Sequence, residues 1–324
     1  MSAPIGVLVM AYGTASGPGD VERYYTDIRG GRPPTPEHLR ELNDRYAAIG
    51  NRFPLLDVTT RQADGLVRVL NETAAAGETF AAYLGMKHSP PPIEDAVARM
   101  RADGIESAVG IVMAPHWSAM SVQTYLDRVT AAAGDGPPSF AFVRSFHDHA
   151  GFVELLASRV AHAFGLLMPA EREKAGVVFT AHSLPVRTEA DGSQRCRSCT
   201  ADDCASACTY RSQLERTARL VAEHLELHNE VTIGWQSAGR TRDPWWGPPI
   251  EDEIQRLAIA GHPAVVVCSA GFVSDHLETL YDLDVEAQEV AAQAGIRLVR
   301  TEMPNADPAF LRVLASVVRE RLTP

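Results

Sequence analysis

Hydrophobic residues along this chain alternate between short runs of strand length and longer segments with helical periodicity. The short runs are rich in β-branched residues, as is typical of strands buried on both faces of a parallel sheet. Strands are predicted at residues 5–10, 80–84, 109–113, 140–143, 177–180, 231–235, 265–268 and 296–299. Amphipathic helices are predicted between most of them, at residues 58–75, 93–102, 122–132, 214–227 and 250–259. Strands that alternate with helices predict a doubly wound α/β fold with parallel sheets.

The two halves of the chain resemble each other weakly. VLVMAYGT near residue 10 is similar to VVFTAHSLP near residue 180, so Ala11 matches Ala181 and Tyr12 matches His182. The strand and helix at 111–125 match those at 267–281 in the same way. We therefore predict two similar domains, residues 1–150 and 151–324, with Tyr12 and His182 at equivalent strand ends across the cleft between them. A last helix at 308–321 is free to pack on either half.

Composition and charge narrow the class of protein. The chain has 324 residues, 45% of them hydrophobic and 22% charged, which is enough for two domains with their own cores. The net charge of -11 disfavours nucleic acid and anionic membranes as partners. No apolar run approaches the roughly 20 residues that span a bilayer, and the N-terminus enters a strand without a basic leader. We expect a cytoplasmic, monomeric enzyme.

A column of carboxylates follows one of the predicted strands. Within residues 265–286, a buried apolar run is followed by Gly271 and by a segment of helix length. Glu278, Asp282 and Glu286 recur there at i, i+4 and i+8, so on a helix they share one face and repel by a few tenths of a kcal/mol per neighbouring pair. A solvated acidic face is one explanation. Because the column starts at the carboxyl end of a buried strand, where open α/β sheets bind ligands, we favour a metal site.

His182 is a second candidate for this chemistry. It directly follows an apolar strand, and imidazole can bind a metal or accept a proton near neutral pH, although a histidine satisfied within the core is equally compatible. Aromatic residues could form walls for a planar macrocycle or could simply pack in the core. Those singled out are Trp235, Trp245, Trp246, Tyr12, Tyr24, Tyr25, Tyr46 and Tyr125. Arg29 and Arg45 could bind carboxylates, or pair with acids on the surface.

Four of the five cysteines lie in one predicted loop, residues 191–208, whereas Cys268 lies in an apolar strand and is expected to be a small buried hydrophobe. The loop has the spacing C-x2-C-x4-C-x3-C, formed by Cys196, Cys199, Cys204 and Cys208. In a reducing compartment, such clustering indicates metal binding before disulfides. The spacing fits either one tetrahedral zinc ion or a small iron-sulfur cluster.

Several motifs in a fixed order resemble one known family. They are MAYGT, ERYYTDIRGGRPP, LNDRYAAIG, YLGMKHSPPPIEDAV, MAPHWSAMSVQTY, AHSLP, GWQSAGRTRDPWWGPP, GFVSDHLETLYDLD and EMPNADP. Together they resemble the ferrochelatases over almost the whole chain, and in particular the bacterial enzymes that insert iron into coproporphyrin III. The resemblance implies a class II chelatase of two Rossmann-like domains, each a four-stranded parallel sheet flanked by helices. Such an enzyme is a lyase of haem biosynthesis that inserts ferrous iron without a nucleotide or a dissociable cofactor.

The resemblance also implies roles for individual residues. His182 and Glu278 match the catalytic pair and metal ligands of the family, and Asp282 and Glu286 match residues thought to relay metal or protons. Tyr12 matches a tyrosine that approaches the porphyrin metal from the opposite face. The positions that match propionate contacts are Arg29, Arg45, Tyr46 and Tyr125.

The chain departs from the family pattern at two places. Phe53 stands where a small polar residue is usual, so one propionate hydrogen bond is expected to be missing. The cysteine segment is an insertion, and because some ferrochelatases carry a [2Fe-2S] cluster, the resemblance favours that cluster over zinc. A protoporphyrin IX ferrochelatase, a cobalt or nickel chelatase, and a porphyrin carrier or iron-sulfur sensor without turnover are the alternatives. A transient contact with a coprohaem decarboxylase is also expected.

Overall fold

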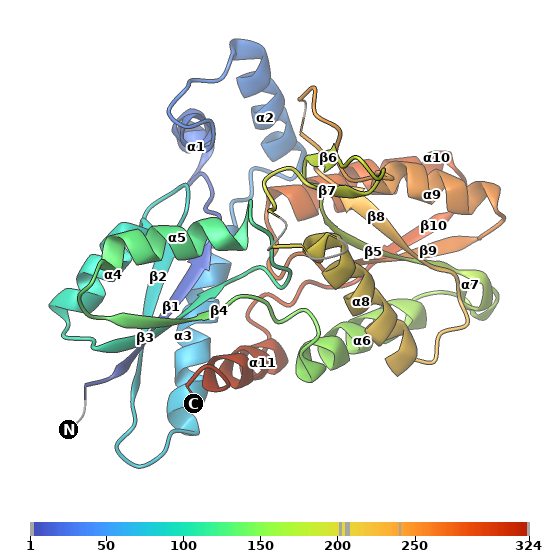
Figure 1. Cartoon of the computed structure of the whole chain (residues 1–324). Helices are drawn as coiled ribbons and strands as arrows, with labels where there is room; N and C mark the ends of the chain where they lie inside the picture. The colour runs from blue at the N-terminus through green and yellow to red at the C-terminus, as the bar shows by residue number, and fades with distance from the viewer. Residues whose placement is uncertain (1–2, 201–202, 205–207, 240, 323–324) are drawn as a thin grey trace.

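The computed structural model describes residues 3–200, 203–204, 208–239 and 241–322, and it confirms the predicted α/β fold (Figure 1). The strands form two parallel four-stranded sheets. Every strand predicted from the sequence overlaps a strand of one of these sheets. The first sheet contains β1 (Ile5–Ala11), β2 (Phe80–Met86), β3 (Ser107–Val112) and β4 (Ser139–Val143). The second contains β5 (Gly176–His182), β8 (Val231–Gln236), β9 (Ala264–Ser269) and β10 (Arg297–Arg300).

Both sheets have the same topology. The first has the order β2-β1-β3-β4 and the second the order β8-β5-β9-β10, so in each half the first strand of the chain lies between the second and the third. β1 and β5 are therefore equivalent central strands, and the weak internal similarity reflects a repeated fold. Tyr12 follows β1 and His182 ends β5, which places both at the carboxyl edges of their sheets. Ligands bind at this edge in open α/β sheets.

Helices cover both faces of each sheet because each presents an apolar stripe to it. The first sheet packs against α3 (Leu55–Glu72) on one face and against α4 (Ile93–Ala102) and α5 (Val122–Ala133) on the other. The second packs against α6 (Ala150–Gly165) and α8 (Thr209–His224) on one face and α9 (Ile250–Ile259) and α10 (Ala287–Gln293) on the other. The short helix α7 (Pro169–Lys174) precedes β5. Among the described helices, none is long and apolar enough to cross a membrane.

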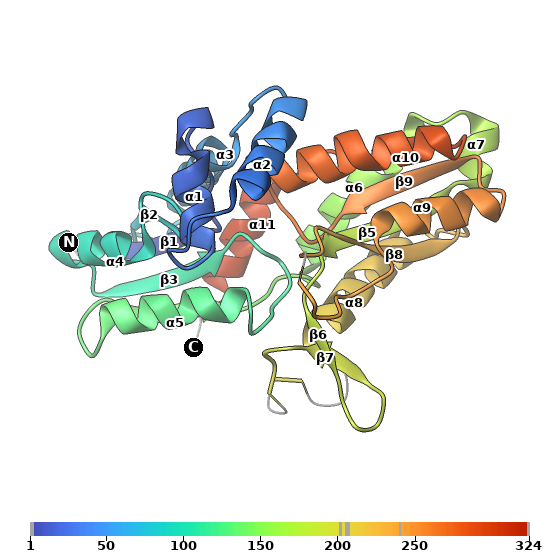
Figure 2. The same ribbon diagram turned by 90° about the horizontal axis from the view of Figure 1, so that it is seen from above.

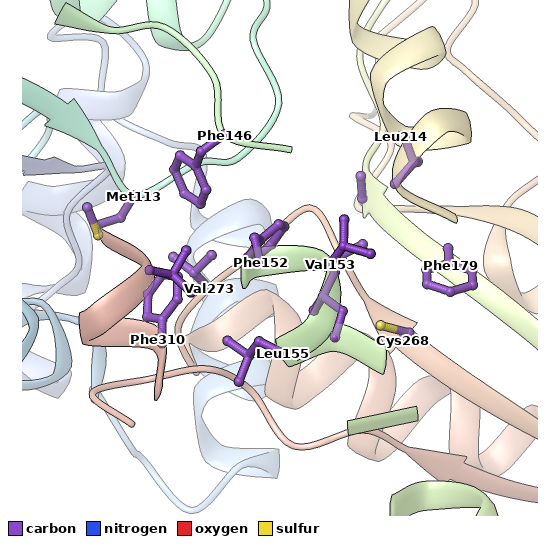
Figure 3. Close-up of a cluster of buried hydrophobic side chains, with 14 of the residues drawn as sticks. Met113, Phe146, Phe152, Val153, Leu155, Phe179, Leu214, Cys268, Val273 and Phe310 are labelled. Atoms are coloured by element: carbon purple, nitrogen blue, oxygen red, sulfur yellow. The ribbon is translucent and has the colours of Figure 1, made fainter. Parts of the chain in front are cut away.

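One hydrophobic core joins the facing sides of the two sheets. It extends from Met113 beside the first sheet, through Phe146 and Phe152, to Phe179 in the second (Figure 3). The last helix, α11 (Pro308–Arg319), lies between the two halves and packs on α3 and α6 (Figures 1 and 2). Burial of its Phe310 side chain alone contributes about 1.5–3 kcal/mol to the stability of the fold. The domain boundary near residue 150 stays a prediction.

Two segments differ from the sequence expectation. Helices α1 (Val21–Ile28) and α2 (Pro36–Ala48), preceded by the 3₁₀ turn η1 (Pro18–Asp20), were not predicted, because their apolar contacts are few and form a separate small core. The predicted loop at 191–208 is partly wrong, since β6 (Val186–Thr188) and β7 (Gln194–Cys196) pair as an antiparallel hairpin that extends away from the second sheet (Figure 2). Residues 201–202 and 205–207 of that loop lie outside the described residues.

Candidate functional site

The structure brings His182 and Glu278 together, although they are distant in sequence. His182 Nε2 lies 3.6 Å from Glu278 Oε1, and both side chains are about one-third exposed. The other ring nitrogen, Nδ1, donates a hydrogen bond to the carbonyl of Ser183. Because Nδ1 is occupied in this way, Nε2 is the nitrogen that faces Glu278 and is free to bind a metal ion.

A close backbone approach positions Glu278 beside His182. The loop after β9 crosses the end of β5, where the Gly271 amide donates to the Thr180 carbonyl at 2.9 Å. A Cβ atom on Gly271 would lie 2.4 Å from the Ala181 Cβ, so only glycine allows this crossing. The side-chain amide of Gln62, on α3, then donates to Val273 O at 3.2 Å and to Ser274 Oγ at 3.0 Å. The loop that carries Glu278 is thus fixed to both halves of the molecule.

Asp282 and Glu286 of the acidic column lie on a π-helix, η2 (Thr279–Glu286), and Glu278 directly precedes it, whereas the sequence pattern indicates only a helix. A π-helix is wider than an α-helix and often occurs at functional sites. Asp282 is only 3% exposed, and its carboxylate accepts a hydrogen bond from Ser237 Oγ. Glu286, one step further along, is partly exposed. The column therefore leads from the His182–Glu278 pair through a buried carboxyl group towards the surface.

Charges in the site raise the pKa values of His182 and Asp282 and lower the pKa of Glu278. Burial disfavours the imidazolium of His182, but the Glu278 carboxylate outweighs this effect and raises the pKa of His182 to about 9. Burial also opposes ionisation of Glu278, yet His182 and His276 hold the pKa of Glu278 well below its ordinary value. Burial and the charge of Glu278 raise the pKa of Asp282 to about 7. At neutral pH the pair is ionised, and Asp282 can gain or lose a proton.

His276 is a site residue that the sequence reasoning missed. Its Nε2 lies 3.6 Å from the second carboxylate oxygen of Glu278, so Glu278 sits between two imidazoles. Phe272 neighbours both histidine rings, with its ring centroid 6.4 Å from that of His182 and 4.6 Å from that of His276. The sequence contains a sign of this role, because His276 precedes Glu278 by two residues in the same motif.

Tyr12 occupies the matching position on the first half. It is 43% exposed, unlike most large apolar and aromatic side chains, and its ring packs at a tilt on His88 with centroids 4.6 Å apart. Partial burial and the negative charge of Glu278 raise the pKa of Tyr12 above its ordinary value. Tyr12 is therefore a neutral phenol at physiological pH, and it is close enough to sense the charge on the opposite half.

The residues predicted to contact propionates lie in different environments. Arg29 is partly exposed, and its guanidinium lies 5.7 Å from the ring centroid of Tyr25. Arg45 stands over Tyr281 of the π-helix at 5.1 Å, beside the acidic column. Tyr125 is 3% exposed and lies beneath the ammonium group of Lys87, at 5.1 Å.

Phe53 and Tyr46 form a packing pair in the structure. Tyr46 is 2% exposed, and its ring stacks on that of Phe53 with centroids 4.3 Å apart. Phe53, where the family resemblance implies a small polar residue, thus has a clear role in packing. In this arrangement the face of Tyr46 is covered by Phe53.

The tryptophans are mainly packing residues. Trp235 and Trp246 are each 3% exposed and stack with centroids 6.1 Å apart, so the core explanation holds for them. Trp245 is partly exposed, and its indole N–H donates to Thr241 Oγ1 at 3.0 Å. Arg240, in the same segment, lies outside the described residues.

All five cysteines are buried and free. Cys268 is fully buried in β9, which confirms its expected role as a small hydrophobe. In the cysteine segment, Cys196 Sγ lies 3.2 Å from Cys208 Sγ, and Cys199 interacts with the thiols of Cys196, Cys204 and Cys208. Two N–H groups donate to sulfur at 3.4 Å: the Trp246 indole to Cys196 and the Thr209 amide to Cys204. The four thiols are therefore gathered at one place.

The described residues nevertheless contain no group of three or more His, Cys, Asp or Glu side chains arranged to hold a metal ion. The expected iron-sulfur cluster is thus not confirmed, and the His182–Glu278 pair offers two ligands where a structural metal site has four.

Comparison with known proteins gives a consistent picture. The family model described as Ferrochelatase matches residues 4–322. The chain is 43% identical over 320 residues to a protein of Anoxybacillus flavithermus named coproporphyrin III ferrochelatase, covering 98% of this chain and 96% of that one. A protein of Bacillus subtilis with the same name is also 43% identical, over 98% of both chains.

A solved structure supports the fold independently of sequence. The sirohydrochlorin chelatase SirB from Bacillus subtilis subspecies spizizenii, in complex with cobalt, matches with a TM-score of 0.55 at 11% identity, covering 99% of this chain and 97% of that one. At 11% identity, this similarity supports the fold only. It agrees with two similar α/β halves of the class II chelatase type.

Proposed function

This chain belongs to the ferrochelatase family, and we propose that it inserts ferrous iron into coproporphyrin III to give iron coproporphyrin III in haem biosynthesis. The observation that carries the proposal is the pairing of His182 with Glu278 at 3.6 Å, opposite Tyr12, in a chain that is 43% identical to proteins named for this activity. Imidazole and carboxylate are both ligands of divalent iron.

The reaction requires two protons to leave the macrocycle as the metal enters. The pyrrole nitrogens of a free-base porphyrin carry these protons, and their lone pairs lie in the ring plane. Before iron binds, His182 is an imidazolium paired with Glu278, because its pKa is about 9. Binding of iron to Nε2 therefore displaces a proton. Asp282, whose pKa is about 7, is the nearest group on the column that can accept protons at neutral pH.

Tyr12 has a different role in this proposal. As a neutral phenol it contacts the metal or the macrocycle from the opposite face, and it does not act as a base. A porphyrin held between this residue and His182 can be distorted towards a form in which the nitrogen lone pairs point at the metal. Distortion accelerates insertion only if the distorted form is bound more tightly than the flat one. Glu286 then relays protons or iron between the column and the surface.

The proposal is tested by following porphyrin fluorescence without air. Adding ferrous iron and catalytic amounts of protein to coproporphyrin III is expected to abolish the fluorescence, with kcat/KM at least about tenfold higher than for protoporphyrin IX, which has two fewer carboxylates to bind. Higher kcat/KM with protoporphyrin IX, or insertion only of cobalt or nickel, would identify one of the alternative chelatases. Tight porphyrin binding without turnover would identify a carrier.

We also propose that the cysteine segment holds a [2Fe-2S] cluster through Cys196, Cys199, Cys204 and Cys208. Four buried thiols at one place support this proposal, as do N–H donors to two of the sulfurs, because such hydrogen bonds tune iron-sulfur clusters. When bound, the cluster supplies one-electron redox chemistry. No step of metal insertion depends on it here.

Anaerobically purified protein is expected to absorb visible light and to contain about two iron and two sulfide per chain. Cys196→Ala should remove both, whereas Cys268→Ala, a matched change at a buried cysteine outside the segment, should remove neither. Stoichiometric zinc without sulfide would contradict the assignment. A cytoplasmic location and a transient contact with a coprohaem decarboxylase also stay proposals.

A further inference from the structure

A tyrosine outside the predicted site contacts the backbone of His182. Tyr210, on α8 two residues after Cys208, donates a hydrogen bond from its hydroxyl to the His182 carbonyl at 2.9 Å. The side chain is only 7% exposed. Because this carbonyl belongs to the peptide that links His182 to Ser183, the bond constrains the peptide plane next to the imidazole.

The imidazole itself is hydrogen-bonded to the next peptide along the chain. His182 Nδ1 donates to the Ser183 carbonyl, one peptide further along. From the other side, Ser183 Oγ donates to the Trp246 carbonyl at 2.8 Å, and the Trp246 amide donates to the Leu184 carbonyl at 3.1 Å. The Ser183 amide donates to the Gln236 carbonyl at 2.7 Å, so Gln236 holds one end of the peptide after His182 and Tyr210 holds the other.

The Tyr210 ring has little freedom to move. It packs edge-on against His116, with centroids 6.3 Å apart, and at a tilt against Trp235, at 5.8 Å. Helix α8 is itself attached to the first half of the molecule. Gln213 accepts a hydrogen bond from the Trp117 amide at 2.7 Å, and Thr217 donates to the His147 carbonyl at 2.9 Å.

We propose that Tyr210 is a positioning residue that holds His182 Nε2 opposite Glu278. Its hydroxyl reaches His182 from a helix that is anchored on the half of the molecule that carries Tyr12. The bond thus fixes the metal-binding nitrogen relative to both sides of the site. The inference rests on the proposed function, because it assigns Tyr210 a part in presenting His182 to the metal.

The test is Tyr210→Phe, which removes one hydroxyl and leaves the ring packing in place. Losing a buried neutral hydrogen bond of this kind is expected to lower kcat for ferrous iron insertion about tenfold, with porphyrin affinity within about twofold of wild type. The matched control is Tyr83→Phe. Tyr83 is also 7% exposed, and its hydroxyl donates to Asp103 at 2.9 Å, on the far side of the first sheet. This control should lose comparable thermal stability but keep full turnover.

A second measurement separates positioning from general destabilisation. Binding of Mn2+, which prefers oxygen and nitrogen ligands and avoids the thiols, is followed by electron paramagnetic resonance without porphyrin, and His182→Ala identifies the signal from the site. Tyr210→Phe should weaken this binding about tenfold, whereas Tyr83→Phe should leave it unchanged. Turnover of Tyr210→Phe within about twofold of wild type, or unaltered Mn2+ affinity, would overturn the proposal. If the wild-type protein inserts no iron, the proposed function fails while the Mn2+ comparison still tests the role of Tyr210.

Discussion

Replacing His182 by alanine is expected to lower the rate of iron insertion by about a thousandfold or more, while the porphyrin still binds. The imidazole is the nitrogen ligand at the centre of the site, and its Nε2 faces Glu278 at 3.6 Å. Alanine removes the nitrogen ligand. It also removes the group that gives up a proton when the metal binds. The macrocycle would lose little of its contact area, so its affinity should change by less than about fivefold.

This result is measured by anaerobic fluorescence assays of turnover and by equilibrium titration with coproporphyrin III. His162→Ala is a suitable control, because His162 is exposed on α6 and lies outside the site. It should leave both quantities unchanged. Near-normal turnover in His182→Ala would refute the assignment of His182 as the metal ligand.

Glu278→Gln is expected to reduce turnover about a hundredfold or more and to change the ionisation of His182. In the wild-type protein, attraction to Glu278 overcomes the effect of burial and holds the pKa of His182 at about 9. Glutamine keeps the shape but removes the charge. Burial is then opposed only by the Ser183 carbonyl and the charge of Asp282, so the pKa of His182 should fall well below about 9. Titration of the His182 ring protons by NMR measures this shift.

The same pair predicts how stability depends on pH. Because the pKa of His182 is raised in the folded protein, its stabilising contribution is complete below about 6.5 and is lost as the pH rises through about 9. The contribution of Glu278, whose pKa is lowered, is present above its ordinary value and is lost as the pH falls towards the lowered pKa. The wild-type melting temperature should therefore fall between pH 7 and 10 more steeply than that of Glu278→Gln.

Glu302→Gln provides a matched control for these measurements. Glu302 also pairs with a cation, Arg159, at 2.8 Å, but its side chain is 66% exposed. This variant should keep the wild-type turnover and the wild-type slope of melting temperature against pH, since exposed ion pairs contribute little. A His182 that still titrates near pH 9 in Glu278→Gln would contradict the coupling of the two residues.

The repeated topology explains why the site lies where it does. In each half, the central strand ends next to a residue that can face a metal: Tyr12 after β1 and His182 at the end of β5. The hydrophobic core between the two sheets and the helix α11 hold the halves together. Equivalent positions of a duplicated fold thus supply chemically different groups, a neutral phenol and an imidazole, to the two sides of one site.

The sequence determined the strands, their parallel arrangement and the two similar halves, because buried β-branched runs and amphipathic helices follow from local periodicity. It also singled out His182 and the carboxylates from Glu278 to Glu286, since their positions at strand ends are visible in the chain. The family resemblance, carried by motifs in a fixed order, supplied the chemistry. Local patterns were weakest for α1 and α2, whose few buried residues form only a small separate core.

Only the tertiary structure decided which of these groups meet and in what state of charge. The crossing of Gly271 over Ala181 and the hydrogen bonds from Gln62 bring Glu278 to His182. These contacts join residues far apart in sequence, whereas His276, the second neighbour of Glu278, lies only two residues before it. The pKa of Asp282 likewise depends on burial and on neighbours brought close by folding. Periodicity reports which residues share a face, whereas distances and electrostatics between elements arise only when the chain packs.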